Sequence, residues 1–276
     1  MAGKLLLIGT PIGNLGDLSA RAIEAMKSCS LLLCEDTRHT RKLLTHFGIE
    51  VRVQSFHEHN EEHKSDQMLD RVQFGETVGL VSDAGMPLLS DPGYLLVQRA
   101  RERKIAVEPI PGPFAAALAL VASGLPPIPF AFFGFAPHKQ GERVAFFQRV
   151  GAAEMTAVVY ESPQRLVTSL EDALVVLGDV DVTVAREMTK LHEQFLHGTL
   201  SEILPVLRKQ EMIRGEITVV FGAGKREAPI LDSAAVRSEF ERLRESGLRR
   251  PDVVKILSER YGIRKNELYQ MLLQEE

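Results

Sequence analysis

The chain has 276 residues, a net charge of −4, 45% hydrophobic residues and 25% charged residues, which is the composition of a folded soluble protein. The charge argues against a wholly basic nucleic-acid-binding protein, and no apolar run approaches the roughly 20 residues of a membrane helix. Cys29 and Cys34 fit neither a CxxC pair nor a zinc knuckle, so we interpret them as two buried thiols. The N-terminal residues carry no signal-peptide pattern, so we expect a cytoplasmic protein. The length exceeds one ordinary core and predicts two or three units.

Strand and helix patterns alternate through the first 120 residues, as in a parallel sheet covered by helices on both faces. The expected strands are residues 4–8, 31–34, 50–55, 77–81 and 105–110. The expected helices are residues 17–27, 36–47, 61–73, 93–103 and 113–123. These elements predict an N-terminal doubly wound α/β domain, residues 1–118.

A Gly- and Pro-rich segment, residues 124–130, separates this pattern from a second one. The next expected strands are residues 131–134, 156–160, 181–186 and 216–221. The helices between them are expected at residues 143–150, 164–177 and 201–210. This alternation predicts a second α/β domain, residues 119–226.

The last part of the chain, residues 227–276, contains no strand pattern and predicts a small helical extension. Amphipathic spacing indicates helices at residues 233–246, 252–261 and 265–273. Residues 248–265 are rich in Lys and Arg. Gly262 between two helices is typical of a helix-turn-helix, but a plain solvated helical face explains the same composition.

Three Gly- and Pro-bearing loops follow expected strands of the first domain. They are residues 9–16, 82–93 and 109–113. The first loop has neither the dinucleotide fingerprint nor the Gly-Lys-Ser/Thr of a P-loop. Open α/β sheets bind ligands beyond the carboxyl ends of their strands, so we predict that the second and third loops form one small-molecule site. The first loop could approach an adenosine or a phosphate closely, and a structural tight turn is the alternative.

The segment 57–63 contains His59-x-x-Glu62-His63, which has the spacing of a zinc-protease motif. We expect the helix to begin only near Glu61, which leaves His59 in the preceding turn, and no third ligand is evident. A polar helix start or a substrate-facing edge of the site explains these residues better. We therefore expect no metal.

Charged residues crowd two further strand ends, residues 160–165 and 186–193. Opposed charges at such a place shift one another's pKa values and can supply acid/base chemistry. A solvated loop is the alternative explanation. The pattern does not tell which residue acts.

Seven short segments occur in an order that resembles the ribosomal RNA small subunit methyltransferase I group of the tetrapyrrole methylase superfamily. They are residues 8–17, 34–39, 55–61, 82–87, 109–113, 160–163 and 186–190. The resemblance runs from about Leu5 to Gly222, and the tail is similar to that group's helix-turn-helix extension. Thr10 and Asn14 replace the glycines and prolines usual in the corrin and sirohaem branch, which favours the RNA branch.

The resemblance implies a two-domain tetrapyrrole-methylase-like α/β fold, with S-adenosylmethionine bound as methyl donor in a cleft between the domains. It further implies a homodimer that methylates a cytidine ribose at its 2′-oxygen in the decoding region of 16S rRNA, within the 30S subunit. A small-molecule methyltransferase of the tetrapyrrole type and a non-catalytic RNA-binding protein are the alternatives.

The resemblance also places site residues. The expected donor-binding residues are Gly9, Pro11, Ser82, Asp83, Ala84, Pro87, Phe114, Ala115 and Met188. The candidate proton acceptors are Glu187, Glu161 and, if its amine is neutral, Lys190, with Asn14 orienting the RNA. The expected RNA contacts are Arg38, Arg41, Lys42, His57, His59 and Arg165.

Overall fold

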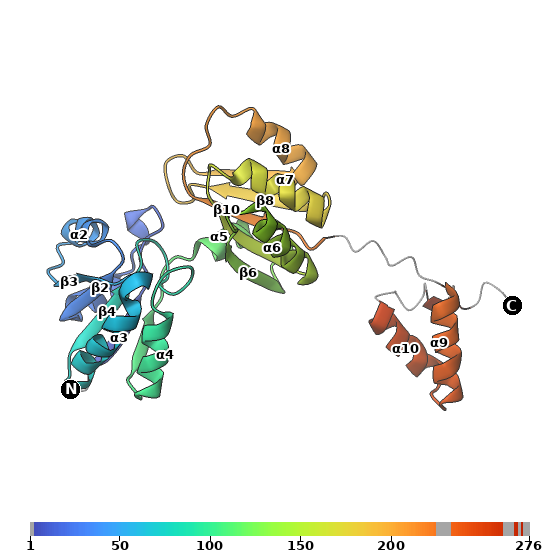
Figure 1. Cartoon of the computed structure of the whole chain (residues 1–276), viewed down its shortest axis with the longest axis horizontal. Helices are drawn as coiled ribbons and strands as arrows, with labels where there is room; N and C mark the ends of the chain where they lie inside the picture. The colour runs from blue at the N-terminus through green and yellow to red at the C-terminus, as the bar shows by residue number, and fades with distance from the viewer. Residues whose placement is uncertain (1–2, 225–232, 262–267, 270–271, 273–276) are drawn as a thin grey trace. The chain divides into compact units, whose positions relative to one another are not determined.

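The computed structural model describes residues 3–224, 233–261, 268–269 and 272. It divides into two compact units, Met1–Gly224 and Lys225–Glu276. The first unit contains both expected α/β patterns, and each pattern forms one sheet (Figure 1).

The first sheet has five parallel strands in the order β3-β2-β4-β1-β5, which confirms the predicted doubly wound fold. Its strands are β1 Lys4–Ile8, β2 Leu31–Cys34, β3 Val53–Ser55, β4 Thr77–Val81 and β5 Val107–Ile110. The chain leaves the neighbouring strands β1 and β4 in opposite directions, toward β2 and toward β5. The crevice at such a reversal is where open α/β sheets bind ligands.

Helices cover both faces of this sheet because its side chains alternate between them. They are α1 Ala20–Ser28, α2 Thr37–His46, α3 Glu58–Gln73 and α4 Tyr94–Glu102. Leu6 and Ile8 of β1 pack in the core cluster that includes α1 and α2 residues, whereas Leu5 packs in the cluster of α3 and α4. Cys29 and Cys34 are buried free thiols, as predicted.

Two helix starts differ from the sequence-based expectation. A 3-10 turn, Leu15–Asp17, precedes α1. Helix α1 begins at Ala20, and Ser19 caps it by accepting a hydrogen bond from the Ala22 N–H. Helix α3 begins at Glu58 rather than near Glu61, because His57 and Asn60 cap its first turn reciprocally. The expectation that His59 precedes the helix is therefore wrong.

The second sheet has the order β6-β7-β10-β8-β9 and is mixed, since only β6 and β7 pair in parallel. Its strands are β6 Phe130–Phe135, β7 Thr156–Glu161, β8 Asp181–Arg186, β9 Gln194–Thr199 and β10 Ile217–Phe221. The sequence did not predict β9, which is an edge strand of mostly half-buried residues with a glycine near its end. Its pattern lacks the apolar run of a buried strand.

Helices α6 Gln140–Ala152, α7 Leu166–Leu177 and α8 Leu200–Arg208 share a core with one face of this sheet (Figure 1). Helix α5, Ala115–Ala122, packs on the other face, against β7 and β10. Because α5 follows β5 directly, it carries the chain from the first sheet onto the second. The predicted boundary at residue 118 falls inside this helix, and the division into 1–118 and 119–226 stays a prediction.

The second unit contains α9 Ser233–Glu245 and α10 Arg250–Tyr261. These helices agree with the predicted ranges to within two residues. Val236, Val253, Val254, Leu257 and Leu268 form a separate small core. Gly262 and most of the third predicted helix, 265–273, lie outside the described residues. None of the helices described is long and apolar enough to cross a bilayer.

Candidate active site

The loops that follow β1 and β4 are pinned together at the reversal point of the first sheet. The Thr10 N–H donates to the Gly85 carbonyl at 2.9 Å, and the Gly85 N–H donates back at 3.1 Å. The Thr10 hydroxyl also donates to the Ser82 carbonyl at 3.1 Å. Residues on both loops therefore hold fixed positions relative to one another.

Gly9 and Ser82 shape these loops. A Cβ on Gly9 would lie 2.6 Å from the Gly112 Cα, so only glycine lets the loops after β1 and β5 approach this closely. The buried Ser82 hydroxyl donates to the Gly85 carbonyl at 3.1 Å. Both residues help to hold the loops in place, and their contact with the donor stays a prediction.

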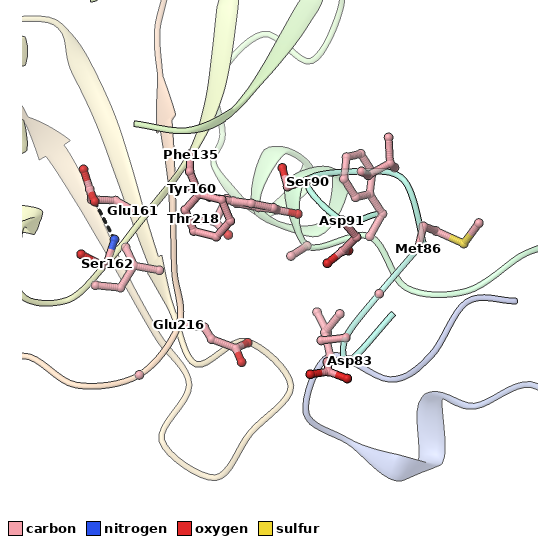
Figure 2. Close-up of a pocket in the computed structure, with 18 of the residues that line it drawn as sticks. Asp83, Met86, Ser90, Asp91, Phe135, Tyr160, Glu161, Ser162, Glu216 and Thr218 are labelled. Atoms are coloured by element: carbon pink, nitrogen blue, oxygen red, sulfur yellow. Dashed lines mark hydrogen bonds between the residues drawn. The ribbon is translucent and has the colours of Figure 1, made fainter. Parts of the chain in front are cut away.

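A pocket of about 370 Å³ opens between these loops and the second sheet (Figure 2). We call it the apolar pocket. Its lining residues are Ile12, Asp83, Ala84, Gly85, Met86, Leu89, Ser90, Asp91, Phe114, Ala115, Phe135, Tyr160, Glu161, Ser162, Pro163, Gly215, Glu216, Ile217 and Thr218. Four of these are acidic, and within the described part of the chain no Lys, Arg or His joins them.

Two side chains of the apolar pocket have strongly raised pKa values. Burial raises the pKa of Asp91 to about 7, and the charges of Glu35 and Asp83 add to the effect. Burial also raises the pKa of Tyr160 to about 12. Both groups hold their protons at neutral pH more readily than in water.

A second pocket, of about 630 Å³, lies beside the first. We call it the basic pocket. Its lining residues are Thr10, Pro11, Ile12, Gly13, Leu15, His39, Lys42, Leu43, His46, Asp83, Ala84, Lys190 and Glu216. His39, Lys42 and His46 follow the i, i+3, i+7 spacing that places side chains on one face of α2.

The two pockets share one wall, which consists of Ile12, Asp83, Ala84 and Glu216. A molecule in each pocket would meet its neighbour at this wall. The arrangement therefore suits a transfer between two bound molecules.

Lys190 lies between two carboxylates that favour its charged form. Its burial lowers its pKa, but hydrogen bonds and charges from Glu187 and Glu216 outweigh burial and raise the pKa above its usual value. The Lys190 Nζ lies 2.9 Å from Glu187 Oε1 and 3.3 Å from Glu216 Oε2. The raised pKa argues against a neutral Lys190 that accepts a proton, and the catalytic role of Lys190 stays a prediction.

The Glu187 carboxylate stabilises the turn that carries Lys190. Its Oε1 accepts from Lys190 Nζ and from the Glu216 N–H, both at 2.9 Å, and these bonds lower its pKa. Glu187 and Thr189 have left-handed φ angles of 51° and 67°. Residues other than glycine rarely adopt this backbone conformation. Glu187 is not among the lining residues of either pocket.

Glu161 is 3% exposed and anchors a local ion pair. Its Oε1 accepts from the Ser162 N–H and from Arg165 Nη2, each at 2.6 Å. Arg165 also approaches the His138 ring at 2.8 Å. The pair turns Arg165, an expected RNA contact, toward Glu161.

The remaining candidates take different places. Lys42 lines the basic pocket, Arg41 is exposed, and exposed Arg38 pairs with Asp36 at 2.9 Å, which lowers the pKa of Asp36 to about 2. His57 is tied to Asn60 at 2.8 Å, and His59 is exposed on α3. His39 and His46 were missed, although their helical spacing to Lys42 was visible in the sequence.

Asn14 joins the two halves of the site. Its Oδ1 accepts from the Gly16 N–H at 2.9 Å, and its backbone N–H donates to the Thr189 hydroxyl at 3.1 Å. The expected RNA-orienting side chain therefore caps the 3-10 turn.

Most expected donor-binding residues gather at the pockets. Asp83, Ala84, Phe114 and Ala115 line the apolar pocket and Pro11 lines the basic one. Pro87 is buried beside them, and Met188 packs in the core beneath α5. The sequence analysis did not name Met86, Ser90, Asp91 or the four residues from Gly215 to Thr218 as site residues. Only the folded chain brings them to the apolar pocket.

No candidate metal centre is found in the described part of the chain. His59 and His63 both lie on α3, but no group of three or more His, Cys, Asp or Glu residues gathers there or elsewhere in the described ranges.

Comparisons with known proteins agree with this geometry. Residues 4–204 match the family model of the Tetrapyrrole (Corrin/Porphyrin) Methylases. Diphthine synthase shares the fold at a TM-score of 0.62 and 14% identity, covering 79% of this chain and 89% of its own. Uroporphyrin-III-C-methyltransferase from Thermus thermophilus shares it at a TM-score of 0.55 and 18% identity, covering 80% and 94%.

Two curated relatives are far more similar. One from Halalkalibacterium halodurans is 41% identical, with 99% of this chain and 96% of the relative covered, and one from Escherichia coli O157:H7 is 40% identical with the same coverage. Both are named ribosomal RNA small subunit methyltransferase I. The chain belongs to this methyltransferase I family, within the tetrapyrrole methylases. The resemblance inferred from seven segments is thereby confirmed.

Membership of the methyltransferase I family covers nearly the whole chain, including Lys225–Glu276. The match to the broader tetrapyrrole methylase model stops within α8, at residue 204. The helical extension is therefore a property shared with the methyltransferase I relatives rather than with that model.

Proposed function

We propose that this chain transfers a methyl group from S-adenosylmethionine to the ribose 2′-oxygen of a cytidine in the decoding region of 16S rRNA, within the 30S subunit in the cytoplasm. The observation that carries the proposal is the wall shared by the apolar and the basic pocket. One pocket suits the donor, the other suits a ribose phosphate, and the reacting groups would meet between them.

The apolar pocket fits S-adenosylmethionine by size and lining. Phe114, Tyr160 and Met86 offer apolar surface to an adenosine, as cofactor sites usually do. Asp83 and Glu216 line the same space, and their carboxylates favour a cation such as a sulfonium. When bound, the donor supplies a methyl group on a sulfonium, which is a good leaving group.

The basic pocket fits the backbone of RNA. His39, Lys42 and His46 offer donors to phosphate oxygens from one face of α2, and Lys190 offers another from the opposite side. Leu15 and Leu43 add apolar surface beside them. RNA loops are recognised by such a mixture of charged contacts and contacts to unstacked bases.

Positioning supplies much of the expected acceleration. The hydrogen bonds between Thr10 and Gly85 fix the shared wall, so the two bound molecules would meet in one orientation. Holding two reactants in an attack geometry is worth roughly 7–11 kcal/mol in favourable systems. The chain therefore needs only one further group, a proton acceptor.

We also propose that the protein acts as a homodimer. Val121 of α5, Ile128 and Phe130 are 76%, 84% and 40% exposed, although all three are apolar. Phe130 begins β6, which is an edge strand of the second sheet. A second copy of the chain would cover this surface.

The test is transfer of a labelled methyl group from S-adenosylmethionine to 30S subunits that lack native decoding-site modifications, followed by nuclease mapping. We expect 2′-O-methylcytidine at one position. Donor binding without methylation of RNA would contradict the proposed acceptor and favour a small molecule of the tetrapyrrole type. Absence of donor binding by calorimetry would contradict the enzymatic function and favour a non-catalytic RNA-binding protein.

A further inference from the structure

The wall between the two pockets carries two carboxylates, Asp83 and Glu216. Figure 2 shows both side chains among those that line the apolar pocket. A hydroxyl in the basic pocket that attacks a methyl group in the apolar pocket must lose its proton near this wall. The proton acceptor should therefore be one of these two groups.

The other ionisable candidates are unsuited to accept that proton. Lys190 forms ion pairs with Glu187 at 2.9 Å and Glu216 at 3.3 Å, which favour its charged form. Glu187 lines neither pocket. Glu161 lines the apolar pocket but not the basic pocket. Its Oε1 accepts hydrogen bonds from the Ser162 N–H and from Arg165, and its Oε2 is buried.

Glu216 is the weaker of the two candidates at the wall. Its side chain is 68% exposed and lies 3.3 Å from the Lys190 Nζ. This ion pair engages the Glu216 carboxylate with Lys190 rather than with a bound hydroxyl. Exposure also leaves the long side chain free to take many rotamers.

Asp83 has the opposite properties. Its short side chain is half-buried, and its Oδ1 accepts a hydrogen bond from the Asp36 N–H at 3.2 Å. Within the described part of the chain it forms no ion pair with Lys or Arg. The loop that carries it is fixed by the bonds between Thr10, Ser82 and Gly85.

We propose that Asp83 is the catalytic proton acceptor; the inference rests on the proposed ribose methylation. As the 2′-oxygen forms its bond to the methyl carbon, the bond from that carbon to sulfur breaks and the sulfonium becomes a neutral thioether. The hydroxyl proton passes to the Asp83 carboxylate, which later releases it to solvent. A carboxylate suffices because the proton leaves only as the oxygen attacks.

Asp83→Asn tests this role without disturbing the loop. The amide oxygen still accepts from the Asp36 N–H, so a purely structural role for Asp83 survives the change. We expect the single-turnover rate of methyl transfer to 30S subunits, at saturating donor and subunit, to fall about 100-fold or more. Donor binding by calorimetry should change far less, and Asp83→Glu should recover part of the rate.

Glu216→Gln is the matched variant at the same wall, and we expect a smaller loss from it. A wild-type rate for Asp83→Asn, with donor still bound, overturns the inference but leaves the proposed function intact. A greater loss from Glu216→Gln overturns it as well and assigns the proton to Glu216. If the unmodified protein methylates no RNA, the proposed function fails and the inferred step fails with it.

Discussion

Asp91 illustrates how one buried carboxyl links the apolar pocket to stability. Burial raises its pKa to about 7 from a usual value of 3.8. Between these pH values the unfolded chain is ionised at this position while the folded chain stays protonated. The free energy of unfolding therefore falls as pH rises through this range and stays reduced above about 7.

Asp91→Asn should remove this penalty. We expect the variant to be more stable than the unchanged protein by about 1–2 kcal/mol near pH 8, after allowance for the partly exposed side chain. The gain should vanish at about pH 2, well below the usual pKa of 3.8, where the carboxyl is protonated in both states. Urea unfolding at the two pH values measures the difference. Glu50→Gln, an exposed carboxylate outside both pockets, is the control, and an equal gain for Asp91→Asn at both pH values would contradict the explanation.

At the same scale, the sequence identified residue types better than residue roles. Glu161, Glu187 and Lys190 stand at strand ends, as their positions along the chain indicated. Their ion pairs with Arg165, Glu187 and Glu216 are visible only in the folded chain. A charged side chain that is held in an ion pair is less available for catalysis than its place in the sequence suggests.

Helix α2 is the element that we expect to bind the acceptor. His39, Lys42 and His46 share its pocket-facing side. Replacing all three with Ala should weaken binding to 30S subunits and reduce its salt dependence by about one unit of slope for each lost phosphate contact. The donor affinity should stay unchanged, because none of the three lines the apolar pocket.

Filter binding over a range of salt concentrations, with calorimetry for the donor, measures both effects. Lys27→Ala on α1 removes an exposed cation outside both pockets and serves as the control. A loss of binding that is equally large for Lys27→Ala, or a salt slope that does not change in the triple variant, would contradict this role of α2.

Element boundaries show why the sequence predicted the first sheet more accurately than the second. Strands such as β2 and β4 are almost entirely buried and appear as short apolar runs. Strand β9 is half-buried at a sheet edge, so its residues carry no such run. Helix α3 began earlier than expected because its cap uses His57 and Asn60, a pair outside the usual Ser or Thr capping box.

At the scale of the whole molecule, the chain consists of two compact units with separate cores. Removing Lys225–Glu276 should therefore leave the first unit folded. We expect the truncated chain to bind S-adenosylmethionine with unchanged affinity but to lose most methylation of 30S subunits, because the Lys- and Arg-rich segment 248–265 would no longer contact RNA. Calorimetry and methyl transfer measure the two activities.

Two outcomes would contradict the role of the extension. Full methylation by the truncated chain would show that the first unit alone recognises the subunit. Loss of donor binding would show that the units depend on one another for folding, against their separate cores.

The sequence by itself determined most of the strands and helices, the α/β class and the family, because apolar periodicity and loop residues are local properties of the chain. It also placed Asp83 just after a strand, Phe114 at a helix start and Lys42 within a helix. Only the tertiary structure decided that Asp83 and Glu216 share a wall between two pockets. This arrangement depends on the reversal of strand order at β1 and β4, and on helix α5, which connects the second sheet to the first. Such long-range packing produces no periodic pattern in the sequence.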